Sequence, residues 1–351
     1  MKAIVVGYGL AGMVFHAPLL KAAGIEVAAV VVRDAERRAL AARDAPDALL
    51  CDDLNEALSR VQATLVVIAS PTATHAPLAL AALAAGCHVV VDKPVALTAV
   101  ECSTVIAAAD EAMRWVIPFQ NRRWDADFLS LKQLIDADEL GDVMRYEARF
   151  DRYNPVVKDR WREHAVAGAG MLYDLAPHLV DQAVQLFGRP DWVFCALLKQ
   201  RAGALTNDGF ELMMGSDDAA YPHVALGVSM FAAAGDVPSG APRFKVYGQR
   251  ASWLKGGFDP QEALLRQGRI PQAMDWVRED EAARGRLIDG ATQAVRLTDA
   301  GVGCWPYFYA QVKRAIECDE PVPVFASEAL LTCEIIDAAL LSAERGARVR
   351  L

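Results

Sequence analysis

The sequence lacks the features that mark several common protein classes. No apolar stretch is long enough to cross a membrane, because Lys21, Glu26 and Arg33 interrupt the longest run. The seven cysteines are scattered, odd in number and never spaced as C-x-x-C, which argues against a disulfide framework and a zinc site. We therefore expect reduced thiols, a cytoplasmic location and no bound metal.

Positive charge is also scarce relative to negative charge. Lys and Arg number 36 against 45 Asp and Glu, which gives a formal net charge of -9. This balance excludes a broad cationic surface for nucleic acid or anionic membrane, so a small molecule is the expected partner. Met1 and Lys2 lead directly into a strand and then to Gly7, which leaves no room for the apolar core of a signal peptide.

The length and the order of apolar segments predict two domains. At 351 residues, 54% of them hydrophobic, the chain exceeds one simple core, and we place the domains at residues 1–120 and 121–351. In the first domain short strands alternate with helices, which predicts an α/β fold with a doubly wound parallel sheet of the Rossmann type. The expected strands are residues 3–6, 27–32, 64–69, 88–91 and 115–119, and the expected helices are 13–23, 35–42, 54–60, 75–85 and 98–111.

Extended segments dominate the second domain, which predicts an α+β domain with a large, mainly antiparallel open sheet. Only one face of such a sheet needs helices, so the other is available for a subunit contact or a substrate cover. The last helix could also pack back on the first domain. The expected strands are residues 143–151, 192–199, 210–214, 224–231, 243–247 and 252–255, and the expected helices are 126–137, 172–187, 307–317 and 327–345.

A glycine motif, G-x-G-x-x-G, stands between the first strand and the first helix. The first glycine allows the tight bend, the second lets the backbone approach a pyrophosphate, and the third permits close packing of helix on strand. Backbone N–H groups at the helix start would hold the diphosphate. We expect the whole motif to bind a dinucleotide, through Gly7, Tyr8, Gly9, Leu10, Ala11 and Gly12.

The end of the second strand bears on which dinucleotide binds. An NAD enzyme usually places Asp or Glu there to hold the ribose 2′-hydroxyl, whereas this strand runs into Arg33. Arginine suits a 2′-phosphate, and Arg37 or Arg38 on the next turn could add charge, so NADP is favoured. Asp34 keeps NAD open, because a small shift of the turn could aim its carboxylate at the ribose.

Lys93 follows a run of three valines that reads as a strand buried on both faces. Polar residues after such a strand emerge at the carboxyl edge of a parallel sheet, where open α/β sheets bind ligands. Lys93 is also the only lysine between Lys21 and Lys132. Lysine, unlike arginine, can serve as a tunable acid or hydrogen-bond donor. A solvated lysine after a strand is the alternative interpretation.

Asp174 and His178 lie four residues apart, which places both on one face of a helix. Histidine can take and return a proton near neutral pH, and a carboxylate beside it can orient it or bind a substrate hydroxyl. Pro177 requires this segment to be the first turn of the helix or a kink. A purely structural pair is the alternative, and Asp181 on the same face is expected to be a salt-bridge partner.

Four segments in this order resemble the glucose-fructose oxidoreductase, inositol dehydrogenase and rhizopine-catabolism (Gfo/Idh/MocA) family. They are the glycine motif, S-P-T-A-T-H at residues 70–75, D-K-P at 92–94 and G-A-G-M-L-Y-D-L-A-P-H at 168–178. Within the family, residues 7–16 and N-R-R-W-D at 121–125 are most similar to the NADP-dependent scyllo-inositol dehydrogenase branch. Two departures are Asp92, where many relatives have Glu, and Val32, where NADP-using relatives often have serine.

The resemblance implies specific site residues. The catalytic lysine, aspartate and histidine of the family correspond to Lys93, Asp174 and His178. Residues implied to line the cofactor are Ser70, Pro71, Thr72 and His75 on the adenosine and pyrophosphate side, Asp92 and Lys93 beside the nicotinamide, and Asn121. Residues expected in the substrate pocket are Arg123, Tyr153 and Trp161, with core packing as the alternative for Trp161.

The expected activity is hydride transfer between NADP, or NAD, and a hydroxyl or carbonyl carbon of a cyclic polyol or sugar such as scyllo-inositol. A homodimer or homotetramer formed through the second sheet is expected. Two alternatives stay open: a dinucleotide-sensing regulator without turnover, and an enzyme acting on a non-carbohydrate such as a dihydrodiol. Retention of both lysine and histidine favours an enzyme, since a sensor has no need of both.

Overall fold

The computed structural model describes the 351 residues except 234, 236–239, 272, 274–275 and 300. The chain divides into two compact units, each built from three segments. The first comprises Met1–Asn121, Gln261–Trp276 and Cys304–Cys333, and the second comprises Arg122–Pro260, Val277–Gly303 and Glu334–Leu351. The first unit thus takes in two later segments that the predicted boundary assigns to the second domain.

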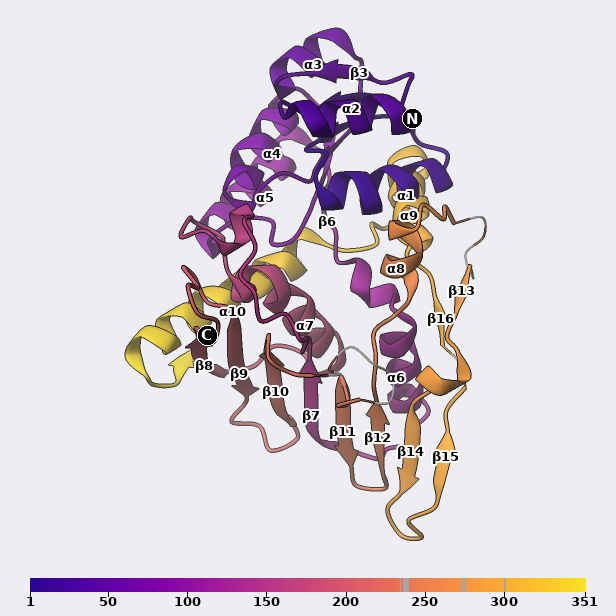
Figure 1. Cartoon of the computed structure of the whole chain (residues 1–351), viewed down its shortest axis with the longest axis vertical. Helices are drawn as coiled ribbons and strands as arrows, with labels where there is room; N and C mark the ends of the chain where they lie inside the picture. The colour runs from indigo at the N-terminus through magenta and orange to yellow at the C-terminus, as the bar shows by residue number, and fades with distance from the viewer. Residues whose placement is uncertain (234, 236–239, 272, 274–275, 300) are drawn as a thin grey trace. The chain divides into compact units, whose positions relative to one another are not determined.

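The first unit contains a six-stranded parallel sheet, so the predicted doubly wound sheet is confirmed (Figure 1). Its strand order is β3-β2-β1-β4-β5-β6. The chain adds strands outward on one side from β1 to β3 and on the other side from β4 to β6, so the topological switch point lies between β1 and β4. All four residues of β4 are buried, as expected for a strand that has helices on both faces. The strands are β1 Lys2–Val6, β2 Glu26–Val31, β3 Leu49–Cys51, β4 Leu65–Ile68, β5 His88–Val91 and β6 Val116–Pro118.

The helices predicted for this unit are present, the first with an earlier start, and a further short helix at residues 261–266 was not predicted. The first helical segment begins at Ala11, as the π-helical stretch η1 Ala11–His16, and continues as α1 Ala17–Ala22. π-helical turns often occur at functional sites. The remaining helices are α2 Ala35–Asp44, α3 Leu54–Arg60, η2 Thr72–Thr74, α4 His75–Ala84, α5 Ala99–Ala112, η3 Asn121–Trp124, which starts at the boundary, α8 Gln261–Arg266 and α9 Pro306–Cys318.

The second unit contains a nine-stranded sheet in the order β15-β14-β12-β11-β7-β10-β9-β8-β17. All its neighbouring strands are antiparallel except β7 and β10, which are parallel, so the predicted mainly antiparallel sheet is confirmed. Its strands are β7 Val143–Arg149, β8 Trp192–Leu198, β9 Gly209–Gly215, β10 His223–Val228, β11 Phe244–Gly248, β12 Ala251–Lys255, β14 Arg286–Asp289, β15 Val295–Leu297 and β17 Val349–Arg350, and β13 Val277–Arg278 pairs separately with β16 Val302–Gly303.

The core of the second unit combines aromatic side chains with buried ions. The guanidinium of Arg243 is fully buried, 4.4 Å from the ring centre of Phe150 and 4.8 Å from that of Phe244. It forms ion pairs with Asp127 and Asp125, which are also fully buried. The helices are α6 Ala126–Asp136, η4 Trp161–Glu163, α7 Met171–Phe187, η5 Glu281–Ala283 and the end of α10 Ala326–Arg345.

Helix α10 crosses the division between the units. Ala329 and Cys333 belong to the apolar core of the first unit, whereas the Ser342 hydroxyl accepts a hydrogen bond from the Cys195 amide of β8. In the part of the chain that the structure describes, no helix is long and apolar enough to span a bilayer.

Candidate functional site

A cavity of about 560 Å³ opens at the carboxyl edge of the parallel sheet. It lies beyond the ends of β1, β2 and β4, which is the crevice where doubly wound sheets bind dinucleotides. Five of the predicted cofactor residues line it: Gly7, Tyr8, Arg33, Ser70 and Pro71.

The glycine turn beside this cavity has no space for side chains at two of its positions. Gly7 has φ +95°, and a Cβ there would lie 2.7 Å from the carbonyl oxygen of Ala69. A Cβ on Gly12 would overlap the carbonyl oxygen of Gly7. The corresponding position on Gly9 would meet only the guanidinium of Arg37, at 3.8 Å. The turn therefore packs tightly inward and leaves its outer backbone open to a phosphate group, so these residues fit a dinucleotide.

The two arginines at the start of α2 differ in what they contact. Arg38 donates hydrogen bonds to the backbone carbonyls of Val32 and Leu50 and forms a 2.7 Å ion pair with Asp52. It therefore ties the end of β2 to the segment after β3. Of the two arginines expected to add charge here, Arg37 lines the cavity, whereas Arg38, a predicted cofactor residue, is not among the lining residues.

The carboxylates around the cavity are engaged in local structure. Asp34 is the N-cap of α2 and accepts a hydrogen bond from the Arg37 amide at 2.9 Å. Asp53 caps α3 in the same way. Arg33 donates from Nε to the carbonyl of Asp52 at 2.9 Å and also lines the cavity. Arg33 and Arg37 are thus the two cations of the cavity wall.

The segment after β4 is held by its own side chains. The hydroxyls of Ser70 and Thr74 lie 2.6 Å apart, and Thr72 is buried. His75, the first residue of α4, is 1% exposed, and its ring nitrogens lie 2.8 Å from the carbonyl oxygens of Ser70 and Pro94. His75 therefore contacts two segments, the one that follows β4 and the one that contains Pro94.

Lys93 follows β5 at the same edge of the sheet, where the Lys93 amide donates to Asp92 Oδ1 at 2.8 Å. The Lys93–Pro94 peptide bond is cis. Behind this segment, buried His16 places Nδ1 2.6 Å from the hydroxyl of Tyr309 in α9. Burial lowers the pKa of His16 to about 4, and Asp92 acts in the opposite direction.

Asn121, at the start of η3, is buried. Like His75, it is a predicted cofactor residue with almost no exposed surface.

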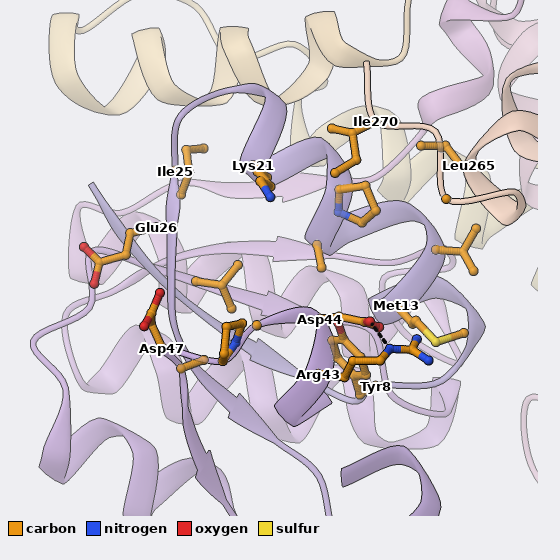
Figure 2. A pocket seen from close by; sticks show the side chains of 18 of the residues that line it. Tyr8, Met13, Lys21, Ile25, Glu26, Arg43, Asp44, Asp47, Leu265 and Ile270 are labelled. Carbon is orange, nitrogen blue, oxygen red and sulfur yellow. Dashed lines mark hydrogen bonds and ion pairs between the residues drawn. The ribbon is translucent and has the colours of Figure 1, made fainter. Parts of the chain in front are cut away.

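A second cavity, of about 600 Å³, lies on the other side of Tyr8 (Figure 2). Residues from α1, the end of α2 and the segment after α8 line it. Burial and the neighbouring Asp44 carboxylate raise the pKa of Tyr8 to about 12, although the Tyr8 hydroxyl makes no hydrogen bond of ordinary geometry there. The Tyr8 side chain is therefore a shared wall between the two cavities.

In the second unit, helix α7 carries Asp174 in its first turn and His178 one turn later, so the predicted helix is confirmed. Pro177 lies inside the helix, past the first-turn position that proline usually takes. His178 is buried with its ring near Phe150, and Asp174 is partly exposed. The Nε of Arg162 lies 3.2 Å from Asp174 Oδ1.

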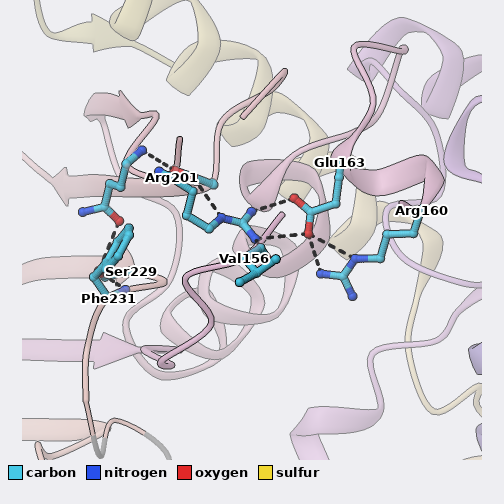
Figure 3. Close-up of polar contacts among 8 residues, drawn as sticks. Val156, Arg160, Glu163, Arg201, Ser229 and Phe231 are labelled. Carbon is cyan, nitrogen blue, oxygen red and sulfur yellow. Dashed lines mark hydrogen bonds and ion pairs between the residues drawn. The ribbon is translucent and has the colours of Figure 1, made fainter. Parts of the chain in front are cut away.

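Arg162 is not among the site residues predicted from the sequence. It comes from the short turn η4, and no fixed spacing links such a turn to α7. The segment that carries it is anchored by buried ions, because Glu163 lies between Arg160 and the fully buried Arg201 (Figure 3). Arg201 also pairs with Asp208 at 3.1 Å.

The expected substrate residues lie in different surroundings. Arg123 forms a two-point ion pair with Asp181, at 2.6 and 2.9 Å, so Asp181 is a salt-bridge partner as predicted. Tyr153 is mostly exposed and pairs with Phe231 through an isolated β-bridge. Trp161 is half-buried, and the guanidinium of Arg162 lies 4.9 Å from its ring centre.

In the described residues, no group of three or more His, Cys, Asp or Glu side chains is placed to hold a metal ion.

Two family profiles match the chain. Residues 1–119 match the oxidoreductase family with an NAD-binding Rossmann fold, and residues 128–254 match the Gfo/Idh/MocA C-terminal domain. These matches confirm the prediction that the protein is an oxidoreductase with a nicotinamide cofactor.

Relatives match over the full length. An uncharacterised oxidoreductase of Escherichia coli, YdgJ, is 38% identical over 99% of this chain and 97% of its own. The scyllo-inositol 2-dehydrogenase (NADP+) IolW of Bacillus subtilis is 34% identical over 100% of this chain and 96% of its own. The solved structure of the oxidoreductase YvaA of Bacillus subtilis is similar with a TM-score of 0.91 and 33% identity, over 100% of this chain and 98% of that one. The chain therefore belongs to the Gfo/Idh/MocA family of oxidoreductases.

Proposed function

We propose that the protein is an NADP-dependent dehydrogenase that acts on a ring carbon of a cyclic polyol or sugar. One observation carries the proposal: Lys93 follows a buried strand at the carboxyl edge of the NAD-binding sheet, in a chain similar over its full length to a protein named scyllo-inositol 2-dehydrogenase (NADP+). The sensing alternative explains the retained lysine and histidine less well.

The preference for NADP is supported by the charges at the end of β2. Arg33 and Arg37 line the cavity and can donate to a 2′-phosphate. The Asp34 carboxylate, which would favour NAD, already caps helix α2. Its Oδ1 accepts the capping hydrogen bond, so a rotation that moved Oδ1 toward a ribose would cost the helix its cap, about 1 kcal/mol.

The chemistry divides between the cofactor and the protein. When bound, the nicotinamide supplies the hydride acceptor or donor. His178 takes the proton from the substrate hydroxyl, and the Lys93 ammonium stabilises the developing alkoxide by a hydrogen bond. Asp174 anchors neighbouring hydroxyls or orients His178, and it also pairs with Arg162 at 3.2 Å.

The remaining substrate residues act around this centre. Tyr153 and Trp161 belong to the segment held by the buried Glu163 and Arg201 pair, so both can be presented to a ring from a fixed backbone. Arg123 stabilises the face of α7 through Asp181 and reaches the substrate only if that pair opens.

The test is a panel of inositols and aldoses with NADP+ or NAD+, read at the absorbance band of the reduced nicotinamide. We expect turnover with at least one ring substrate and faster turnover with NADP+. Dinucleotide binding without turnover on any substrate would favour a sensor, and activity restricted to aromatic dihydrodiols would overturn the substrate class.

We also infer a homodimer or homotetramer formed through the second sheet. Glu147 and Arg149 alternate with buried residues of β7 and form ion pairs across the sheet with Lys245 and Glu211, so this face is polar and partly exposed. Sedimentation velocity of the wild type and of Arg149→Glu tests this. The variant should dissociate, and a monomeric wild type would contradict the inference.

A further inference from the structure

The His75 imidazole lies between two backbone carbonyls, which is an unusual position for a histidine. Its Nδ1 lies 2.8 Å from the Pro94 oxygen, and its Nε2 lies 2.8 Å from the Ser70 oxygen. Carbonyl oxygens only accept hydrogen bonds, and a neutral imidazole has one N–H. In the neutral form, one ring nitrogen therefore has no proton to donate, and its lone pair faces the lone pairs of a carbonyl oxygen. The doubly protonated ring donates a hydrogen bond to each of the two carbonyls.

The two carbonyls belong to different parts of the predicted site. Ser70 follows β4 and lines the cofactor cavity. Pro94 follows Lys93 at the end of β5. A doubly protonated His75 therefore joins the cavity wall to the segment that carries the expected catalytic lysine.

Several effects act on the pKa of His75 in opposite directions. Burial lowers the pKa of His75, Asp92 and the two carbonyls raise it, and Lys93 lowers it. The position of His75 at the start of α4 also disfavours the cation. The proton is thus poorly held in the absence of added negative charge.

We propose that His75 takes up a proton when the dinucleotide binds, and that the doubly protonated ring then clamps the Ser70 and Lys93–Pro94 segments together. This inference rests on the proposed dinucleotide binding. The negative charge of a bound pyrophosphate favours a cation in the same unit, so binding and protonation stabilise each other. His75 is a positioning residue, because it acts on the cofactor and on Lys93 through the backbone.

The sign of the pH dependence follows. Binding that favours protonated His75 raises its pKa, so dinucleotide affinity increases as the pH falls through the His75 pKa of the bound protein and levels off below that of the unbound protein. Each unit of difference between the bound and unbound pKa corresponds to roughly a 10-fold gain in affinity.

Titration calorimetry in buffers of different ionisation enthalpy measures the number of protons taken up on binding. We expect a fraction of one proton more for the wild type than for His75→Gln at about pH 6. NAD+ is measured beside NADP+, because the 2′-phosphate of NADP+ titrates in the same range. His88→Gln is the matched control, since His88 lies at the opposite end of β5 and only accepts a hydrogen bond from the Trp115 amide.

The outcomes separate the two proposals. Failure of both dinucleotides to bind the wild type would contradict the proposed function. Binding with equal proton uptake in the wild type and His75→Gln would overturn the clamp alone. If the variant does not fold, nitrogen NMR of the wild type decides: the cofactor-saturated protein at pH 5.5 should show both His75 ring nitrogens protonated, and a neutral ring there would overturn the inference.

Discussion

Arg37→Ala should weaken NADP+ binding and leave NAD+ binding nearly unchanged. Arg37 lies on the cavity wall, where its guanidinium is the group nearest to a side-chain position on Gly9. A charge-assisted hydrogen bond contributes about 1.5–3 kcal/mol when protected from water. Because the Arg37 side chain is 56% exposed, we use a lower range of about 1–2 kcal/mol, which corresponds to a Kd for NADP+ raised roughly 5- to 30-fold.

Fluorescence quenching or calorimetry with each dinucleotide measures this change. Arg43→Ala is the matched control, because it removes the same charge from the same helix while Arg43 lines the other cavity. It should change neither Kd by more than about 2-fold, since Arg43 is exposed, pairs with Asp44 and does not line the predicted cofactor cavity.

Two results would refute this reasoning. Equal weakening of NAD+ and NADP+ by Arg37→Ala would mean that Arg37 holds the pyrophosphate. An unchanged NADP+ affinity would leave Arg33 as the sole cation of the 2′-phosphate site, and Arg33→Ala would then have to account for the whole preference.

Three further predictions follow from buried or edge residues. Asp127→Ala leaves Arg243 buried without its nearest carboxylate and should lower the free energy of unfolding by about 3–5 kcal/mol in urea titrations; a loss under 1 kcal/mol would contradict this account of the core. The pKa of His16, about 4 in the fold, lies below 6.5, so the unfolded chain binds its proton more tightly. Stability should fall by up to ~3 kcal/mol as the pH drops from 6.5 to 4, less so in His16→Gln, and equal slopes for the two proteins would argue against it. Lys93→Met should lower kcat about 100-fold or more while both dinucleotides still bind, and near-normal turnover would remove Lys93 from the mechanism.

The sheet of the first unit could be predicted because its strands are regular and alternate with helices. The short strand β3 Leu49–Cys51 could not, since three residues carry no readable periodicity. The inclusion of residues 261–276 and 304–333 in the first unit could not be predicted either. An amphipathic helix such as α9 reveals its apolar face in sequence but not which sheet that face covers.

Some residues of the candidate site could be predicted from the sequence and others could not. The glycine turn and Lys93 follow from local rules, because a tight turn and the end of a buried strand are fixed by neighbouring residues. Arg162 could not be found, because its contact with Asp174 depends on the path of an irregular segment. That path is set by Glu163 and Arg201, which are 38 residues apart in the chain.

Arg37 and Arg38 show why residue type alone does not assign a site. The two residues are adjacent on α2. Successive side chains on a helix point about 100° apart, so Arg37 and Arg38 face different surroundings. Arg38 donates hydrogen bonds to the Asp52 carboxylate and to a backbone carbonyl at β3. This strand is the one strand of the sheet that was not predicted from the sequence. Once β3 is in place, Arg38 has partners that hold the sheet edge, and the cavity is left to Arg33 and Arg37. For the proposed NADP site, the contacts of Arg38 with the end of β3 therefore determine which arginines remain available for a 2′-phosphate.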